Sequence, residues 1–141
     1  MVELTGRDLT LAEVARVARG GSRVELSRAA CVGMEKSRRA VLDLVAAGEP
    51  VYGVNTGFGD LACQRIDAGD TRSLQQRLLL SHAAGVGERL PDDVVRGMLL
   101  LRANTLARGH SGVRVELVER LVYLLNTDLL PVVPRKGSVG A

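Results

Sequence analysis

Aromatic side chains are nearly absent from this sequence. It has no Trp, and its 141 residues include only two Tyr and one Phe. Proteins that bind single-stranded nucleic acid stack the bases on aromatic rings and follow the phosphates with a basic groove. Here 19 Lys and Arg are interspersed with 16 Asp and Glu, and no long run of one sign occurs. The sequence therefore predicts no nucleic-acid partner.

Long apolar runs are missing as well. No stretch approaches the roughly 18 apolar residues of a membrane helix, so no membrane partner is predicted. The first residues, MVELTGRDLT, lack the basic start and apolar stretch of a signal peptide. The two cysteines, Cys31 and Cys63, do not have the spacing of a metal site. These absences favour a cytoplasmic protein with reduced thiols and no bound metal.

Helix-forming sequence makes up most of the chain. Thr10 and Glu13 form a capping-box pattern, which predicts a helix that begins at Leu11 and ends at Gly20-Gly21. Ser27 is expected to cap a second, longer helix. The predicted helices cover about 11–19, 28–47, 71–84, 92–108 and 113–126, and short extended segments cover 23–26, 51–54 and 129–134. The predicted fold class is mainly α with short extended segments.

A glycine-rich loop, VYGVNTGFGD, holds most of the chain's few aromatic residues. Glycine lets the backbone turn sharply and approach a ligand closely. Tyr52 supplies a phenol that can move a proton, and Asn55 and Thr56 supply neutral donors and acceptors. The residues leave two interpretations open, a ligand-binding loop or a tight structural loop around a packed tyrosine.

Two further stretches contain candidate polar residues. In LLLSHAAGVGE, His82 ends an apolar helix face and precedes small residues that leave room beside its ring. An imidazole there could bind a ligand, or it could be a core histidine bonded to the backbone. In RANTLARGHSGVR, Asn104 lies inside a predicted helix and His110 begins a turn. The structural interpretation is favoured for this stretch, as the end of one helix and the cap of the next.

Taken together, four motifs resemble those of the histidine ammonia-lyase family in order and spacing. They are YGVNTGFG, SHAAGVG, RANTLARGHSG and PVVPRKGSVGA. The resemblance covers at least residues 51–141. It implies that residues 1–141 are the N-terminal active-site portion of a larger lyase with the fumarase/aspartase-like helical fold. It also implies a homotetramer whose active sites draw on several chains.

The resemblance also implies roles for individual residues. Tyr52 would be the general base that removes a proton from the β-carbon of the substrate, and the loop around it would close over the active site. Gly59 and Asn55 of that loop would contact the substrate. Ser81 and His82 would lie beside the imidazole of L-histidine.

Ala141 corresponds to the first residue of the family's Ala-Ser-Gly triplet. In the family this triplet cyclises into methylidene-imidazolone, an electrophile made from the chain, so no external cofactor is expected. It would make the amino group a better leaving group, and the products would be ammonia and urocanate, the first step of histidine degradation. The sequence ends at Ala141, so we expect an N-terminal piece that needs the rest of the same polypeptide and is inactive alone.

Two alternatives stay open at this point. One is a lyase or aminomutase that acts on tyrosine or phenylalanine. Family members of that kind carry a His-Leu or Phe-Leu pair where this chain has Ser81-His82. The other is a genuinely short, non-catalytic homologue that serves as a binding or structural module.

Overall fold

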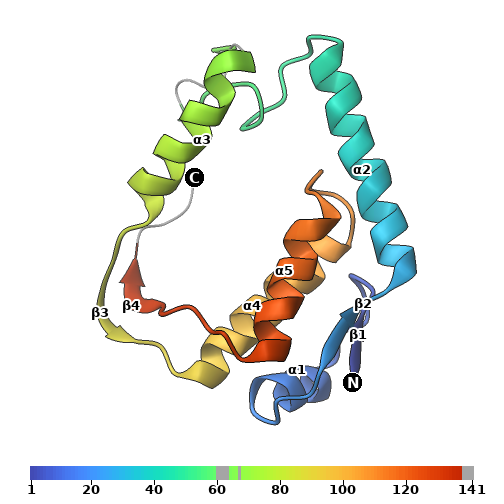
Figure 1. Cartoon of the computed structure of the whole chain (residues 1–141), viewed down its shortest axis with the longest axis vertical. Coiled ribbons are helices and arrows are strands. Elements are labelled where there is room, and N and C mark those ends of the chain that lie inside the picture. The colour runs from blue at the N-terminus through green and yellow to red at the C-terminus, as the bar shows by residue number, and fades with distance from the viewer. Residues whose placement is uncertain (60–63, 67, 138–141) are drawn as a thin grey trace. The chain divides into compact units, whose positions relative to one another are not determined.

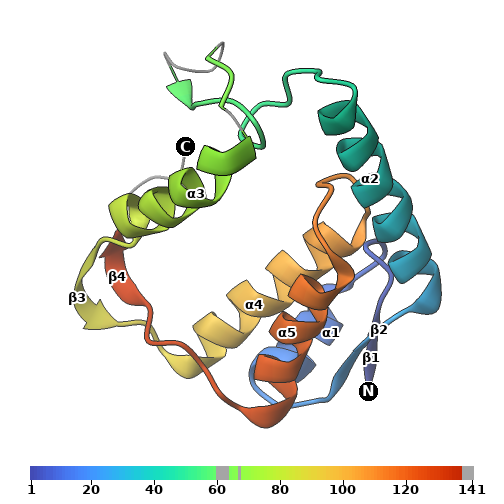
Figure 2. The ribbon, with the colours of Figure 1, turned by 45° about the horizontal axis from the view of Figure 1, so that its top comes forward.

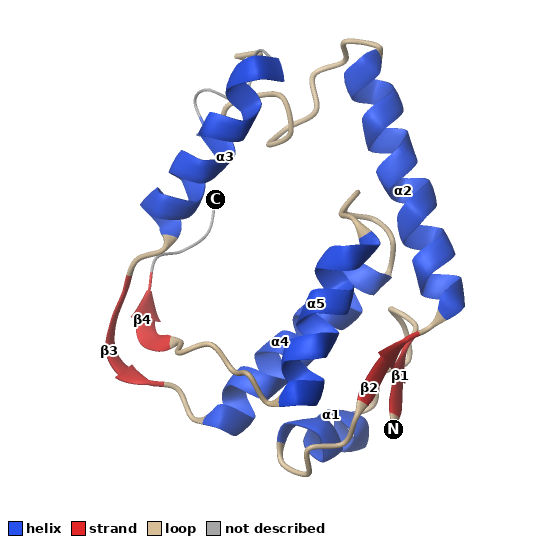
Figure 3. Ribbon diagram, in the orientation of Figure 1, coloured by secondary structure: helices blue, strands red, loops and turns tan. Residues whose placement is uncertain are grey.

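The computed structural model describes residues 1–59, 64–66 and 68–137, which are mainly helical (Figures 1 and 3). Five helices lie in these ranges: α1 (Leu11–Ala18), α2 (Arg28–Ala46), α3 (Ala68–His82), α4 (Asp92–Ala107) and α5 (Val115–Thr127). Four short strands join them: β1 (Val2–Leu4), β2 (Val24–Leu26), β3 (Gly85–Arg89) and β4 (Pro134–Gly137). The predicted fold class is confirmed. Among the described helices, none is long and apolar enough to cross a membrane.

The chain divides into two compact units. The first contains residues 1–40 and 90–133, and the second contains residues 41–89 and the segment from Pro134 onward. Helix α2 begins in the first unit and ends in the second. Each unit has its own small sheet, and the candidate site residues that the structure describes all belong to the second unit.

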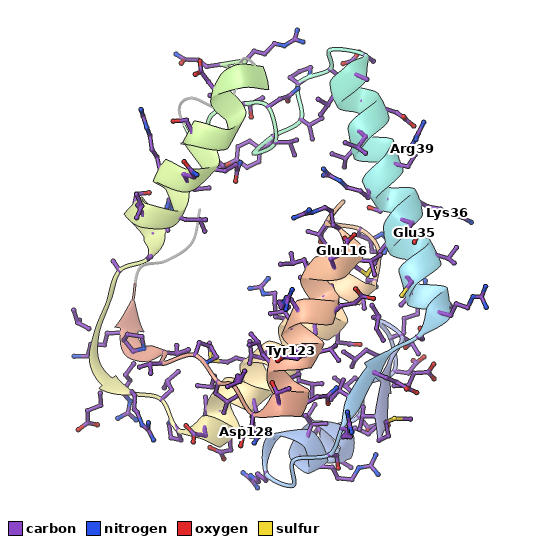
Figure 4. The ribbon with its side chains drawn as sticks, in the orientation of Figure 1. Glu35, Lys36, Arg39, Glu116, Tyr123 and Asp128 are labelled. Carbon is purple, nitrogen blue, oxygen red and sulfur yellow. The ribbon has the colours of Figure 1, made fainter. Side chains whose placement is uncertain are left out.

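In the first unit α4 packs between α1 and α5, and the parallel pair β1–β2, in which Val2 lies opposite Val24, contacts α4 and α5 (Figure 2). Its core is aliphatic, with Leu4, Leu100 and Val118 fully buried. Since apolar burial is the main favourable term in folding, this small cluster positions the three helices. Helix α5 is followed by Asp128 (labelled in Figure 4), which has a left-handed conformation. Its carboxylate pairs with Arg96 of α4.

The predicted helix caps of this unit are confirmed. Thr10 Oγ1 accepts from the Glu13 N–H at 3.3 Å, and Glu13 Oε2 accepts from the Thr10 N–H at 2.9 Å. The Glu13 carboxyl accepts from both the N–H and, at 2.8 Å, the hydroxyl of Thr10, and these two bonds lower its pKa because they favour its charged form. Ser27 Oγ likewise accepts from the Ala30 N–H at 3.1 Å at the start of α2.

Asn104 has a structural role in the first unit. Its Oδ1 accepts from the Gly6 N–H at 3.1 Å, which holds the loop after β1 against α4. A Cβ at Gly6 would lie 2.5 Å from the backbone nitrogen of Arg108, and the Gly6 φ is +78°. Gly6 therefore allows a close backbone approach that no other residue permits. This agrees with the structural interpretation of the stretch around Asn104.

The second unit contains the end of α2, helix α3 and the antiparallel pair β3–β4. Gly85 lies opposite Gly137 and Val86 opposite Lys136, with an irregularity before the next pair. Strand β3 was not predicted from the sequence. Its sequence, GVGER, lacks the alternation of apolar and polar residues that marks a half-buried strand, and all five residues are exposed.

Three predicted segments differ clearly from the structure. Residues 51–54 are not extended, because the chain turns through 52–55 and the Asn55 N–H donates to the Val51 carbonyl at 3.2 Å. Helix α3 begins at Ala68, three residues before the predicted start. The last strand begins at Pro134, whereas the extended segment was predicted to end there.

Candidate functional site

The candidate site begins at the turn that carries Tyr52. The Tyr52 side chain is 58% exposed, so its position depends on its own backbone more than on packing around it. The next residue, Gly53, has φ +71°, a conformation that other residues rarely adopt. A Cβ there would also lie 3.1 Å from the Phe58 ring. Glycine is thus favoured at position 53 by the turn, and a side chain there would also crowd the Phe58 ring.

Tyr52 and Phe58 account for two of the chain's three aromatic residues, and they pack together. Their ring centroids are 5.8 Å apart and their planes meet at 74°, an edge-to-face contact. Such contacts are worth about 0.5–1.5 kcal/mol beyond the area they bury. The loop therefore brings its phenylalanine back onto its tyrosine.

Asn55 and Thr56 are buried beneath this turn. Asn55 Oδ1 accepts from the Val51 N–H at 2.7 Å, and Asn55 Nδ2 donates to the Glu49 carbonyl at 2.9 Å. Thr56 Oγ1 accepts from the Gly53 N–H at 3.1 Å. Both side chains thus bind the backbone of their own loop. The substrate contact expected of Asn55 stays a prediction, as does that of Gly59, which is exposed with φ +55°.

Ser81 and His82 lie at the C-terminal end of α3, and both are exposed. Ser81 Oγ donates to the Leu78 carbonyl at 3.0 Å. His82 Nδ1 lies 3.0 Å from the same carbonyl and 2.9 Å from Ser81 Oγ. A proton on Nδ1 satisfies both contacts, because each oxygen can then accept. This assigns the Nδ1–H tautomer, in which Nε2 is the acceptor nitrogen of the neutral ring.

Gln75 links the Tyr52 turn to the helix of His82. Its Nε2 donates to the Gly53 carbonyl at 3.2 Å. Gln75 and His82 are seven residues apart, so they lie on the same face of α3, separated by about 10 Å along its axis. The turn that carries Tyr52 is therefore bound to the helix face that carries His82. The sequence analysis missed Gln75, because the residues around a glutamine in a predicted helix do not indicate that its side chain binds a distant loop.

The approach to the predicted electrophile lies beside the chain that follows His82. Gly137, at the end of β4, is paired with Gly85, three residues after His82. Ala141 itself lies outside the described residues, and so does Cys63. Within the ranges that the structure describes, no group of three or more His, Cys, Asp or Glu side chains could hold a metal ion.

Comparison with known proteins shows the family of this chain. Residues 9–141 match the family model for aromatic amino acid lyases. The chain is 54% identical over 135 residues to the histidine ammonia-lyase of Deinococcus radiodurans, covering 96% of this chain and 26% of that protein. It is 49% identical to the histidine ammonia-lyase of Shouchella clausii over all of this chain and 28% of that protein. The chain thus spans about a quarter of the length of these relatives.

Solved structures share the fold of the described residues. An ergothioneine-degrading enzyme, ergothionase from Treponema denticola, superimposes with a TM-score of 0.93 at 36% identity, over 98% of this chain and 28% of that one. A tyrosine aminomutase from Streptomyces globisporus gives a TM-score of 0.91 at 36% identity, over 97% of this chain and 26% of that one. The helical ammonia-lyase fold expected from the sequence is confirmed.

Proposed function

Because the chain belongs to the aromatic amino acid lyase family, we propose that the complete protein is a histidine ammonia-lyase. It would eliminate ammonia from L-histidine and release urocanate, the first step of histidine degradation. The observation that carries the proposal is the bond from Gln75 to the Gly53 carbonyl, because it binds the turn that carries Tyr52 to the face of α3 that carries His82.

Tyr52 is the base in this proposal. Its phenolate oxygen takes a proton from the β-carbon of the substrate, and the electron pair left behind forms the new carbon–carbon double bond. The bond from the α-carbon to nitrogen breaks, and ammonia leaves with that bond's electrons. A positioned general base contributes about 10²–10⁴-fold to the rate of such a step.

His82 recognises the substrate side chain through a hydrogen bond in this proposal. With its proton on Nδ1, the ring presents Nε2 as an acceptor, which suits the N–H of the substrate imidazole. An imidazole enclosed without such a partner would lose about 1–3 kcal/mol for each unpaired polar group. Ser81 supports this role, because its hydroxyl shares the Leu78 carbonyl with His82 and holds the ring at the helix end.

The electrophile is proposed to be methylidene-imidazolone, formed from Ala141 and the Ser and Gly that follow it in the family. When formed, it supplies an electron-poor alkene that binds the amino group and makes it a better leaving group. The pairing of Gly137 with Gly85 supports this assignment, since Gly137 lies four residues before Ala141 in the sequence and Gly85 three residues after His82. We propose no metal and no external cofactor.

The active protein needs more than these residues. The chain spans about a quarter of its relatives, so the rest of the same polypeptide is part of the proposal. We further propose that the complete protein forms a homotetramer in the cytoplasm. Residues 1–141 alone should be inactive.

Tyrosine is the alternative substrate, since a tyrosine aminomutase shares this fold at 36% identity. The identity to a histidine ammonia-lyase is higher, at 54%. The pair Ser81-His82 favours histidine, because a leucine at the second position would present an apolar wall to a benzene ring. A non-catalytic homologue that serves as a binding module is the remaining alternative.

One assay separates these possibilities. The complete protein is incubated with L-histidine, L-tyrosine or L-phenylalanine, and both ammonia and the ultraviolet absorbance of the product are measured. We expect urocanate and ammonia in equal amounts from L-histidine. An aminomutase would convert tyrosine without releasing ammonia, and a binding module would convert none of the three. Residues 1–141 alone, assayed in parallel, should show no turnover.

A further inference from the structure

We propose that Gln75 is a positioning residue. It acts by holding the backbone beside Tyr52 at a fixed position along α3. The inference rests on the proposed function, because it takes Tyr52 as the base. Its physical basis is the hydrogen bond of 3.2 Å from Gln75 Nε2 to the carbonyl of Gly53. The bond is partly buried and joins residues 22 positions apart in the sequence.

Both backbone polar groups of Gly53 are held by side chains. Its N–H donates to Thr56 Oγ1 at 3.1 Å, and its carbonyl accepts from Gln75. Glycine has more backbone freedom than any other residue, so a glycine beside a catalytic group needs such restraints. Without them, the left-handed turn at φ +71° could relax and carry the Tyr52 phenol with it.

Among the residues that the structure describes, the Tyr52 side chain has little other support. It is 58% exposed, and it makes an edge-to-face contact with Phe58, which belongs to the same loop. That contact fixes the ring relative to the loop but does not fix the loop relative to α3. The position of the phenol along α3 therefore depends on how the backbone of the turn is anchored.

The two restraints on Gly53 act at different ranges. Thr56 lies three residues away and is almost fully buried, so it shapes the turn itself. Gln75 lies on α3, two helical turns before His82 and on the same face. Its bond therefore holds the turn against the helix that ends in Ser81 and His82, while backbone bonds join Asn55 to Ile66 and Gly57 to Gln64 just before that helix. Misplacing a catalytic group by about 1 Å can lower the rate of the catalysed step on the order of 10²-fold.

The chain offers a matched control in the neighbouring residue. Gln75→Glu keeps the size of the side chain but replaces the amide donor with a carboxylate that repels the Gly53 carbonyl. Gln75→Met removes the donor without adding charge. Gln76→Glu makes the same chemical change one residue along, where the side chain is exposed. All three are made in the complete protein, together with Tyr52→Phe.

A double-mutant cycle tests the inference. We expect Gln75→Glu and Gln75→Met to lower kcat for L-histidine by about 10–100-fold with KM changed less than about threefold. Gln76→Glu should leave both values within about twofold. In the Tyr52→Phe background, Gln75→Glu should cost less than about threefold more, because a residue that acts through Tyr52 has nothing left to position. Equal losses in the two backgrounds would overturn the inference.

Hydrogen exchange of the segment 51–57 gives a readout that does not depend on turnover. It should be faster in both Gln75 variants than in the parent and in Gln76→Glu, with the same melting temperature. Unchanged exchange would overturn the inference even if the complete protein makes urocanate. If Tyr52→Phe keeps full activity, the proposed base is wrong, and the positioning role of Gln75 is overturned with it.

Discussion

The side-chain amide of Asn126 binds both backbone polar groups of Val24, as a neighbouring strand would. Asn126 Oδ1 accepts from the Val24 N–H at 2.8 Å, and Nδ2 donates to the Val24 carbonyl at 2.7 Å. Val24 is buried in β2, which pairs with β1 in a two-stranded sheet. The end of α5 thus supplies the hydrogen bonds that a further strand would have made.

Replacing this amide should destabilise the first unit. Asn126→Ala leaves a buried donor and a buried acceptor of Val24 without partners, so we expect a loss of about 2–4 kcal/mol. Thr127→Ala is the control, because that exposed hydroxyl bonds only within its own helix, to the Tyr123 carbonyl. Urea unfolding of the complete protein measures both changes. Equal stability of the two variants would contradict the structural role of Asn126.

The local signals in the sequence predicted the helices of the first unit well. The cap formed by Thr10 and Glu13 could be recognised because its partners are three residues apart. The bonds from Asn126 to Val24 could not, because these residues are 102 positions apart and nothing in either neighbourhood indicates the other. The same holds for Asn104 and Gly6, which are 98 positions apart.

The candidate site residues were likewise predicted from short motifs of neighbouring residues. The resemblance to the family drew attention to Tyr52 and to Ser81-His82, each within a recognisable motif. It gave no reason to consider Gln75, whose role depends on the folding of a loop onto a helix. The extended conformation predicted for 51–54 was wrong because the Asn55 side chain closes the turn instead.

An apolar groove in the first unit predicts that residues 1–141 alone will self-associate. The groove, of about 510 Å³, is lined by Met98 and Leu101 of α4 together with Pro131 and Val133. Met98 and Leu101 are about half exposed, and exposed apolar patches drive association. We expect light scattering to show species heavier than the 15.0 kDa monomer.

Charge in this groove should reverse the association. The double variant Met98→Lys, Leu101→Lys should be mainly monomeric at the same concentration. The control Leu79→Lys, Leu80→Lys changes two exposed leucines of α3, in the second unit, and should leave the groove-driven association in place. A monomeric parent chain, or equal effects of the two pairs, would contradict the prediction.

Cys31 should react slowly with alkylating reagents near neutral pH. Burial raises the pKa of its thiol, and the carboxylates of Glu119 and Glu35 raise that pKa further (Figure 4 shows Glu35 on α2). A raised pKa leaves less thiolate at a given pH, and the thiolate is the nucleophile. In a Cys63→Ser variant of the complete protein, the iodoacetamide rate should reach half its maximum above pH 9.0, the ordinary thiol value.

Removing a carboxylate tests the cause of this shift. Glu119→Gln should move the half-maximal pH downward, since it removes a charge that opposes the thiolate. In urea the half-maximal pH of the parent should fall to that of a free cysteine. A folded protein with the same half-maximal pH as the unfolded chain would contradict the prediction.

Tyr52→Phe should remove the base and little else. The substitution keeps the ring and its edge contact with Phe58 but deletes the oxygen that accepts the proton. We expect kcat for L-histidine to fall by about 10²–10⁴-fold, with an unchanged melting temperature. The matched control is Tyr123→Phe, which deletes the phenol oxygen of a half-exposed tyrosine in the first unit. A loss below about tenfold in Tyr52→Phe would assign the base elsewhere.

Ser81 and His82 should set the preference for L-histidine over aromatic substrates. The test is the double change Ser81→His, His82→Leu in the complete protein, which creates the pair found in family members that act on tyrosine. The kcat/KM values for L-histidine and L-tyrosine are measured before and after the change. Single variants at each position show which of the two residues is responsible.

The expected direction follows from hydrogen bonding at the end of α3. In the proposed site, the Leu78 carbonyl keeps the His82 proton on Nδ1, and Nε2 would then accept from the substrate imidazole. Leucine cannot accept, so a bound imidazole would lose its partner, and a site built to bond its ligand discriminates strongly against an unbonded one. We therefore expect kcat/KM for L-histidine to fall at least about tenfold, and tyrosine to be relatively favoured. If the ratio of the two values stays within about threefold of the parent, Ser81 and His82 do not read the substrate, and the tyrosine alternative gains support.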